Sequence, residues 1–238
     1  MTSNSLKAAL FCSFLLLGIA GCTPLPKVVP QKPTTIASLS EIRQIISADS
    51  NQALLSLKSR LPNLITDWKY ASYNNFTHQI LYQQPEAYLR RQPALALQKV
   101  NKELNTIGLG VILFDAYRPY KVTRKMWAIV PDERYAANPA KGSGHNRGAA
   151  VDLTLYDLQT GKALNMGTDF DHFSDTAHHD FTSLPEQVLK NRQLLKQTMM
   201  KHGFLPLSTE WWHYSWPDAA KNFALMDLSF KQLKRLSR

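Results

Sequence analysis

Two histidines and an aspartate have the types and surroundings expected of a catalytic zinc centre. His145 lies in the glycine-flanked stretch SGHNRG, Asp152 follows seven residues later in AVDLTL, and His213 comes near the far end of the chain in EWWH. Imidazole and carboxylate groups both suit Zn²⁺, and three protein ligands leave the fourth tetrahedral position for water. The set predicts one zinc ion per chain, at a site that the fold and not a local helix assembles.

Glu210, three residues before His213, is the candidate general base. Positions three apart on a regular strand face opposite sides, so the two side chains can meet only if a turn or bulge intervenes. The carboxylate would then lie beside the metal-bound water without being a ligand. A lone ExxH pattern is frequent by chance, whereas HxxGxAxD with an adjoining SxH is much more specific.

The elements expected around these motifs are helices interleaved with short strands. Helices are predicted over 40–61, along the face of Leu97, Val100, Leu104 and Ile107, and from a capping box of Ser183 and Glu186 to Gly203. Strands are predicted at 111–114, at 150–155 and in EWWHYSW from residue 210. The strands lack the regular spacing of βαβ units, so the prediction is an α+β fold. It would be a small antiparallel sheet with packed helices and the zinc site at the sheet.

The N-terminal residues resemble a targeting signal and are not expected to belong to the folded domain. Residues 1–21 have the cation, short apolar core and small-residue exit of a signal peptide. The segment Ile19-Ala20-Gly21-Cys22 at the end of this stretch resembles a bacterial lipobox, which makes Cys22 the candidate lipidation site. The proline-rich residues 22–38 suggest a tether, and 39–238 a single domain. We therefore expect a lipoprotein of the cell envelope that faces the periplasm, held by its lipid in the outer membrane if the cell is Gram-negative.

Length and composition narrow the remaining function classes. The 238 residues are 44% hydrophobic, which is enough for a real core, and the formal charge is +10. Because the chain is expected to be exported, nucleic acid is excluded as the partner of this positive charge. The densest group of Lys and Arg residues lies at the C-terminus. Two cysteines cannot form a disulfide framework, and loss of the signal would leave no cysteine nucleophile.

Three segments together resemble a known family. The stretches SGHNRGAAVDLTL, EWWHY and DAYRPY are similar to those of the zinc D-alanyl-D-alanine dipeptidases, within the D-Ala-D-Ala metallopeptidase group. DWKYASYNNFT, MGTDFDHF and HHDF agree with the same pattern, so the resemblance covers roughly residues 64–216. It does not extend to the lipobox, the tether or the helical stretch before residue 61.

The resemblance implies a role for each matching residue. His145, Asp152 and His213 match the zinc ligands, and Glu210 matches the catalytic base and acid. Arg118 matches the arginine that stabilises the transition state. Asp171 matches the acid that receives the substrate ammonium, and Tyr70 and Ser143 match residues that line the dipeptide pocket. One position departs from the pattern, because Gly144 stands where a related resistance enzyme has a serine. Three further histidines, His172, His178 and His179, have no match in the zinc set and are expected in loops or around the site.

The implied function is zinc-dependent hydrolysis of the small dipeptide D-Ala-D-Ala to two D-alanines. Two alternatives stay open. One is a D,D-carboxypeptidase or endopeptidase that acts on longer wall peptides, against which Asp171 argues because it would read a free ammonium. The other is a non-catalytic, lipid-anchored zinc domain that binds wall peptides, against which Glu210 and the complete ligand set argue.

Overall fold

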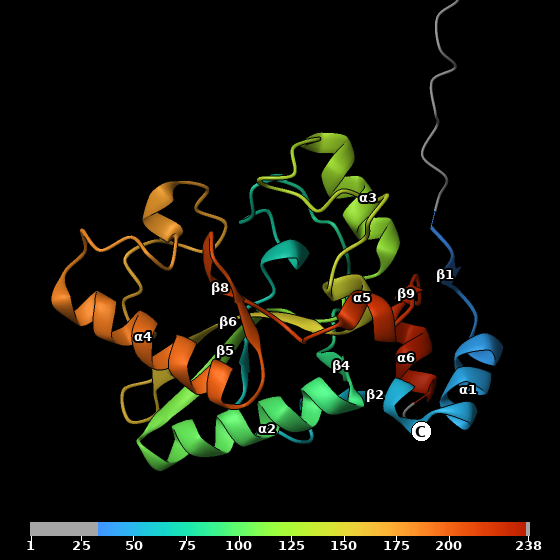
Figure 1. The fold of residues 1–238 in the computed structure, drawn as a ribbon, viewed down its shortest axis with the longest axis horizontal. Coiled ribbons are helices and arrows are strands. Elements are labelled where there is room, and N and C mark those ends of the chain that lie inside the picture. The colour runs from blue at the N-terminus through green and yellow to red at the C-terminus, as the bar shows by residue number, and fades with distance from the viewer. Residues whose placement is uncertain (1–32, 237–238) are drawn as a thin grey trace, which may run out of the picture. The chain divides into compact units, whose positions relative to one another are not determined.

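A five-stranded sheet carries the motifs in the computed structural model, which describes residues 33–236 (Figure 1). Its strand order is β3-β5-β6-β8-β7, with bounds Ile65–Thr66, Leu109–Asp115, Ala150–Asp157, Glu210–Ser215 and Leu205–Leu207. The pairs β5-β6, β6-β8 and β8-β7 are antiparallel, and the short β3 joins β5 in parallel. Apart from that edge strand, the expected antiparallel sheet of an α+β fold is confirmed.

Six helices and two small strand pairs surround this sheet within residues 33–236. The helices are α1 Leu39–Ala48, α2 Arg91–Thr106, α3 Tyr120–Ile129, α4 Glu186–Lys201, α5 Ala219–Asn222 and α6 Phe230–Leu236. The pairs are β1 Thr35–Ile36 with β9 Leu225–Met226, and β2 Leu54–Ser56 with β4 Tyr88–Arg90. None of the helices in this part of the chain is long and apolar enough to cross a membrane.

The main core lies between one face of the sheet and two helices. Alternation along β6 places Val151, Leu153 and Leu155 on this face, and all three are fully buried. They belong to one hydrophobic cluster with apolar side chains of α2 (Leu97, Val100, Leu104) and of α4 (Leu195, Met199). Figure 1 shows both helices on the same side of β5, β6 and β8. The opposite face, which carries Asp152, is left for the site.

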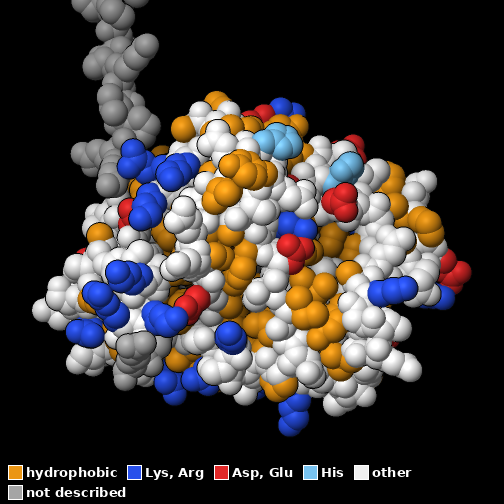
Figure 2. Space-filling model, turned by 180° about the vertical axis from the view of Figure 1, so that it is seen from behind, with side chains coloured by type: hydrophobic (Ala, Val, Ile, Leu, Met, Phe, Trp, Pro, Cys, Tyr) orange, Lys and Arg blue, Asp and Glu red, His pale blue; other side chains and the backbone are white. Residues whose placement is uncertain are grey.

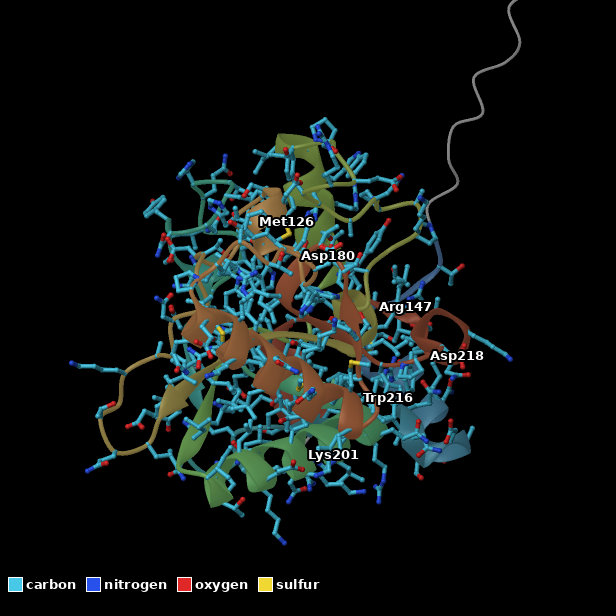
Figure 3. The ribbon with its side chains drawn as sticks, turned by 60° about the vertical axis from the view of Figure 1, so that its left-hand side comes forward. Met126, Arg147, Asp180, Lys201, Trp216 and Asp218 are labelled. Carbon is cyan, nitrogen blue, oxygen red and sulfur yellow. The ribbon has the colours of Figure 1, made fainter. Side chains whose placement is uncertain are left out.

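The ends of α2 and α4 agree with their sequence signals in part. Ile107, expected on the buried face of α2, lies just past the helix end and is 56% exposed. Lys201 in the last turn of α4 lies beside α2 (Figure 3), with its Nζ 2.8 Å from Glu103 Oε1. The expected capping box is wrong: α4 begins at Glu186 after Pro185, and no side chain caps it. The N-cap position falls on Pro185, two residues after Ser183, so Glu186 is the first residue of the helix and the box is out of register.

The predicted helix over 40–61 is also too long. The helix α1 ends at Ala48, and the Asp49 side chain accepts a hydrogen bond from Asn51 N at 2.9 Å. This local bond competes with helix continuation. A 3₁₀ turn and β2 follow, because Leu54–Ser56 gain a strand partner in β4 that comes from distant sequence.

The start of the fold lies earlier than residue 39. Strand β1 falls inside 22–38, the range expected to be a tether, and pairs in parallel with β9. Residues 1–21 and Cys22, for which a signal peptide and lipidation are predicted, lie outside the described residues.

The basic surplus of the chain is unevenly spread over the surface. Figure 2 shows Lys and Arg side chains concentrated on the left of that face and sparse over the rest. The cations of α6, Lys231, Lys234 and Arg235, are exposed, in agreement with a solvated C-terminal helix face.

Candidate active site

The sheet brings the three predicted ligands together on the face opposite the core. In the antiparallel register of β6 and β8, Asp152 pairs with His213, so their side chains are direct cross-strand neighbours. His145 opens the 3₁₀ turn His145–Arg147 that leads into β6. One possible ligand atom from each of the three residues lies within 4.8 Å of the others.

The spacing of these donor atoms fits a zinc ion. His145 Nε2 lies 3.3 Å from His213 Nδ1 and 3.3 Å from Asp152 Oδ2. Donors about 2.1 Å from a tetrahedral zinc lie about 3.4 Å from one another. His213 Nδ1 and Asp152 Oδ1 are somewhat closer, at 2.8 Å. Two imidazole nitrogens and one carboxylate are the donor set of many catalytic zinc sites.

The two buried ligands are held in the form that binds a metal. His145 Nδ1 lies 2.8 Å from the carbonyl oxygen of Ala116, which accepts a hydrogen bond from the Nδ1 proton. The lone pair of Nε2 is then free to bind a metal. Burial opposes ionisation of Asp152, but His145 and His213 outweigh it and lower the pKa of its carboxyl group. The backbone of the β5–α3 connection therefore orients one ligand, and the site itself keeps another charged.

Glu210 joins His213 through an irregularity in the sheet. The β7-β8 register shifts between the pairs Leu207–Glu210 and Pro206–Tyr214, which meets the condition that a turn or bulge must intervene. It brings Glu210 Oε2 to 4.0 Å from His213 Nδ1. Burial raises the pKa of Glu210, the histidines His213 and His145 lower it, and Asp152 raises it again, with a net rise. A carboxyl group with a raised pKa beside a metal site is suited to proton transfer.

Arg118 is buried and clamped by an acid that the sequence reasoning did not single out. Arg118 Nε and Nη2 each lie 2.7 Å from Asp115 Oδ2, and Nη2 lies 3.9 Å from Asp152 Oδ2. Burial alone would lower the pKa of Arg118, but the nearby Asp115 raises it above its ordinary value. The only sequence signal for Asp115 is its place three residues before Arg118 in DAYRPY.

Asp171 and Tyr70 meet beside Arg118. The hydroxyl of Tyr70 donates to Asp171 Oδ1 at 3.1 Å, and the Arg118 guanidinium lies 4.9 Å from the Tyr70 ring centre. Asp171 Oδ2 is buried and has no hydrogen-bond partner in the structure. Burial raises the pKa of Asp171 well above its ordinary value, and the carboxylates of Asp152 and Glu210 raise it further. Asp171 Oδ2 is thus a buried acceptor without a hydrogen bond, which costs free energy unless a ligand donates one to it.

All eight predicted site residues line one cavity of about 200 Å³. They are Tyr70, Arg118, Ser143, His145, Asp152, Asp171, Glu210 and His213. Trp212 and Tyr135 are also part of its wall. Ser143 also supports the turn that carries His145, because its Oγ accepts a hydrogen bond from His145 N at 3.2 Å.

The extra histidines lie apart from the three ligands. His172 lines a separate groove of about 770 Å³, which Trp211 also borders. His178 lies 3.8 Å from Asp175 in a neighbouring loop, and the His179 ring packs against Tyr214. Among residues 33–236, the only group of three or more possible metal ligands is His145, Asp152 and His213.

Comparison with known proteins agrees with this geometry. A family described as D-ala-D-ala dipeptidase matches residues 50–232. The chain belongs to this peptidase family. All eight residues that line the cavity and were predicted from the sequence fall inside the matched range.

Curated relatives of this family cover most of the chain. The D-alanyl-D-alanine dipeptidase of Escherichia coli is 37% identical over 174 residues, which are 73% of this chain and 90% of that protein. The enzyme of the same name from Enterococcus faecalis is 32% identical over 196 residues, 72% of this chain and 97% of that protein. A solved vancomycin-resistance D,D-dipeptidase in complex with a D-Ala-D-Ala phosphinate analogue is 16% identical, with a TM-score of 0.35, covering 70% of this chain and 68% of that one.

Proposed function

We propose that this chain hydrolyses D-Ala-D-Ala to two D-alanines with one zinc ion held by His145, Asp152 and His213. The family membership and the fit of the three donor atoms support a zinc peptidase. The observation that carries the choice of a free dipeptide is the buried, unpartnered Oδ2 of Asp171 in the wall of the same cavity.

Asp171 is the group that would recognise the ammonium of the substrate. One carboxylate oxygen is already satisfied by Tyr70, and the other is buried without a partner. A bound ammonium would pair with that oxygen and offset the burial that raises the pKa of Asp171. The small volume of the cavity, about 200 Å³, supports a substrate of two small residues.

Zinc, when bound, polarises the scissile carbonyl and lowers the pKa of water. Glu210 lies 4.0 Å from the candidate donor atom of His213 without being one of the three ligands. It would take the proton of the attacking water and deliver it to the leaving amine. The net rise in its pKa favours the first of these steps, since a more basic carboxylate takes a proton from water more readily.

Arg118 would receive the negative charge that develops on the former carbonyl oxygen. Asp115 holds the guanidinium through two contacts of 2.7 Å, so Arg118 needs little reorganisation at the moment of reaction. A fixed cationic donor at such a place is typically worth about 3 kcal/mol of transition-state stabilisation.

The decisive experiment compares free D-Ala-D-Ala with N-acetyl-D-Ala-D-Ala. Blocking the amine removes a charged hydrogen bond and leaves Asp171 buried without a partner, a loss of about 2–5 kcal/mol. We expect the blocked dipeptide to be cleaved at least about a hundredfold less efficiently. Equal cleavage of both, or preference for a pentapeptide, would instead support the D,D-carboxypeptidase alternative.

The matched control is Asp171→Asn, which keeps the shape of the side chain and removes its charge. We expect this variant to lose most of its kcat/KM on the free dipeptide and little on the acetylated one. Zinc content should be unchanged, because Asp171 is not one of the three ligands. Absence of any hydrolysis by wild type holding one zinc ion would favour the non-catalytic binding alternative.

We also propose that the chain is a lipoprotein anchored through Cys22 in the cell envelope, facing the periplasm. The support is the sequence alone: the apolar signal, Ile19-Ala20-Gly21-Cys22 and the proline-rich segment after it. Cys22→Ser should block lipidation and move the protein out of the membrane fraction, as measured by fractionation. Equal membrane association of this variant would rule the anchor out.

A further inference from the structure

The hydroxyl of Ser215 is in contact with one of the candidate zinc ligands. Ser215 ends β8 two positions after His213, so the two side chains lie on the same face of the strand. Ser215 Oγ lies 3.0 Å from His213 Nε2. Ser215 lies in the segment EWWHYSW but is neither a predicted site residue nor one of the cavity-lining residues.

The contact involves the nitrogen of His213 that does not face the other ligands. His213 Nδ1 lies 2.8 Å from Asp152 Oδ1 and 3.3 Å from His145 Nε2, so Nδ1 is the donor atom for the metal. A neutral imidazole that binds a metal through Nδ1 carries its proton on Nε2, and that proton needs an acceptor. Within the described residues, the side-chain oxygen in hydrogen-bond contact with His213 Nε2 is Ser215 Oγ.

The neighbouring backbone explains why a hydroxyl fits at this place. A Cβ atom at Gly144 would lie 3.3 Å from Ser215 Oγ and 2.9 Å from the Cβ of Ala150. A side chain at position 144 would therefore press on the Ser215 hydroxyl. Gly144, which departs from the serine of a related enzyme, leaves room for a hydroxyl supplied from position 215.

The strand end that carries Ser215 is fixed on both sides. Ser215 pairs with Ala150 of β6 and with Leu205 of β7. The next residue, Trp216, donates its backbone N–H to the Ala149 carbonyl at 2.7 Å and lies near the C-terminal end of α4 (Figure 3). The Ser215 hydroxyl is thus presented by a rigid segment and not by a loop.

The two histidine ligands differ in what holds their second nitrogen. For His145 the acceptor is the backbone carbonyl of Ala116, which no substitution of that residue's side chain removes. For His213 it is a side chain, so the contact can be deleted by a single substitution.

We propose that Ser215 is a positioning residue, which accepts the Nε2 proton of His213 and thereby aims Nδ1 at the zinc ion. The inference rests on the proposed zinc centre. It predicts that Ser215 acts on metal affinity through His213, without touching substrate.

The test measures zinc affinity of the full chain by competition with a chelating indicator. Loss of such a supporting contact typically weakens metal binding about 10–100-fold, and we expect this for Ser215→Ala. Ser215→Thr keeps the hydroxyl on a strand position and should restore affinity to within about threefold of wild type. Ser47→Ala, at an exposed serine of α1, is the matched control and should leave affinity unchanged.

A second readout separates positioning from a general loss of folding. The metal-free proteins should melt at the same temperature, while added zinc should raise the melting temperature of Ser215→Ala less than that of wild type. The visible absorption of the Co²⁺-loaded protein should change in Ser215→Ala and recover in Ser215→Thr. Zinc affinity and Co²⁺ spectrum of Ser215→Ala equal to wild type would overturn the inference, whereas wild type that binds no zinc would overturn the proposed metal centre itself.

Discussion

Glu210 is the residue whose proposed chemistry can be separated most cleanly from metal binding. Its carboxylate lies close to His213 because of the bulge between β7 and β8, and it is not one of the three grouped ligands. A base in this place transfers protons without contributing a ligand bond. Its loss should therefore affect turnover and leave the metal in place.

We expect Glu210→Gln to lower kcat by about 10²–10⁴-fold, since the amide preserves shape but accepts no proton from water. Zinc content, measured by elemental analysis, should stay at the wild-type level. His213→Ala is the comparison variant, and it should lose metal and activity together. A Glu210→Gln protein without zinc would make Glu210 a ligand and contradict its assigned role.

At the scale of elements, the end of β5 positions much of the site. The register of β5 against β6 shifts between Leu113 and Asp115, and Asp115 follows this bulge fully buried. Its Oδ1 accepts from the Tyr82 hydroxyl and from Ala116 N, each at 2.9 Å, while Oδ2 holds Arg118. The same short connection thus fixes the cation and, through the Ala116 carbonyl, the His145 ring.

Removing the charge of Asp115 should consequently act through Arg118. We expect Asp115→Asn to lower kcat at least about tenfold, and Arg118→Ala to lower it about 10²–10³-fold. The double variant should be little worse than Arg118→Ala, because the two residues act as one unit. Kinetics on free D-Ala-D-Ala measure all three.

The matched control for this pair is Tyr82→Phe, which removes another contact of Asp115 and leaves Arg118 bound. It should retain most of the wild-type kcat. Effects of Asp115→Asn and Arg118→Ala that multiply independently would show that Asp115 does not act through the arginine.

At the scale of the whole molecule, one histidine outside the site links stability to pH. Burial, together with the nearby cations Lys196 and Arg192, lowers the pKa of His179 from its ordinary 6.5 to about 4. Its Nε2 is buried without a hydrogen-bond partner. Between pH 6.5 and 4 the unfolded chain therefore binds a proton at His179 that the folded chain does not. In this window, stability falls as the pH is lowered.

We expect His179→Gln to make this fall shallower. Free energies of unfolding from denaturant titrations at several values between pH 4 and 7.5 would measure the slope, with the metal removed from both proteins. At pH 7.5 both side chains are neutral, so the comparison there gives the effect of packing alone. Parallel pH profiles for the two proteins would mean that His179 takes up its proton equally in both states.

Residue types and periodicity were sufficient to predict the candidate site residues and the simpler elements. Local rules are enough where periodicity and residue type decide the outcome, as in the inward faces of α2 and α4 or the strand that contains Asp152. His145, Asp152 and His213, the candidate zinc ligands, were likewise predicted from the residue types in their motifs. Strand geometry also predicted that Glu210 and His213 can meet only if a turn or bulge intervenes, and the register of β7 against β8 is irregular there.

The groups that support the candidate site residues could not be predicted in this way, because they depend on tertiary contacts. The end of the helix predicted over 40–61 is instead strand β2, because it pairs with β4. Since β4 lies more than thirty residues away in the chain, local sequence rules did not reveal this pairing. The clamp of Asp115 on Arg118 depends on a bulge set by pairing with β6, and the contact of Ser215 with His213 depends on the space left at Gly144. The pairing of β2 with β4, the register of β5 against β6 and the approach of Gly144 to Ser215 each join segments distant in sequence. Their energies depend on packing and register, which local propensity does not encode.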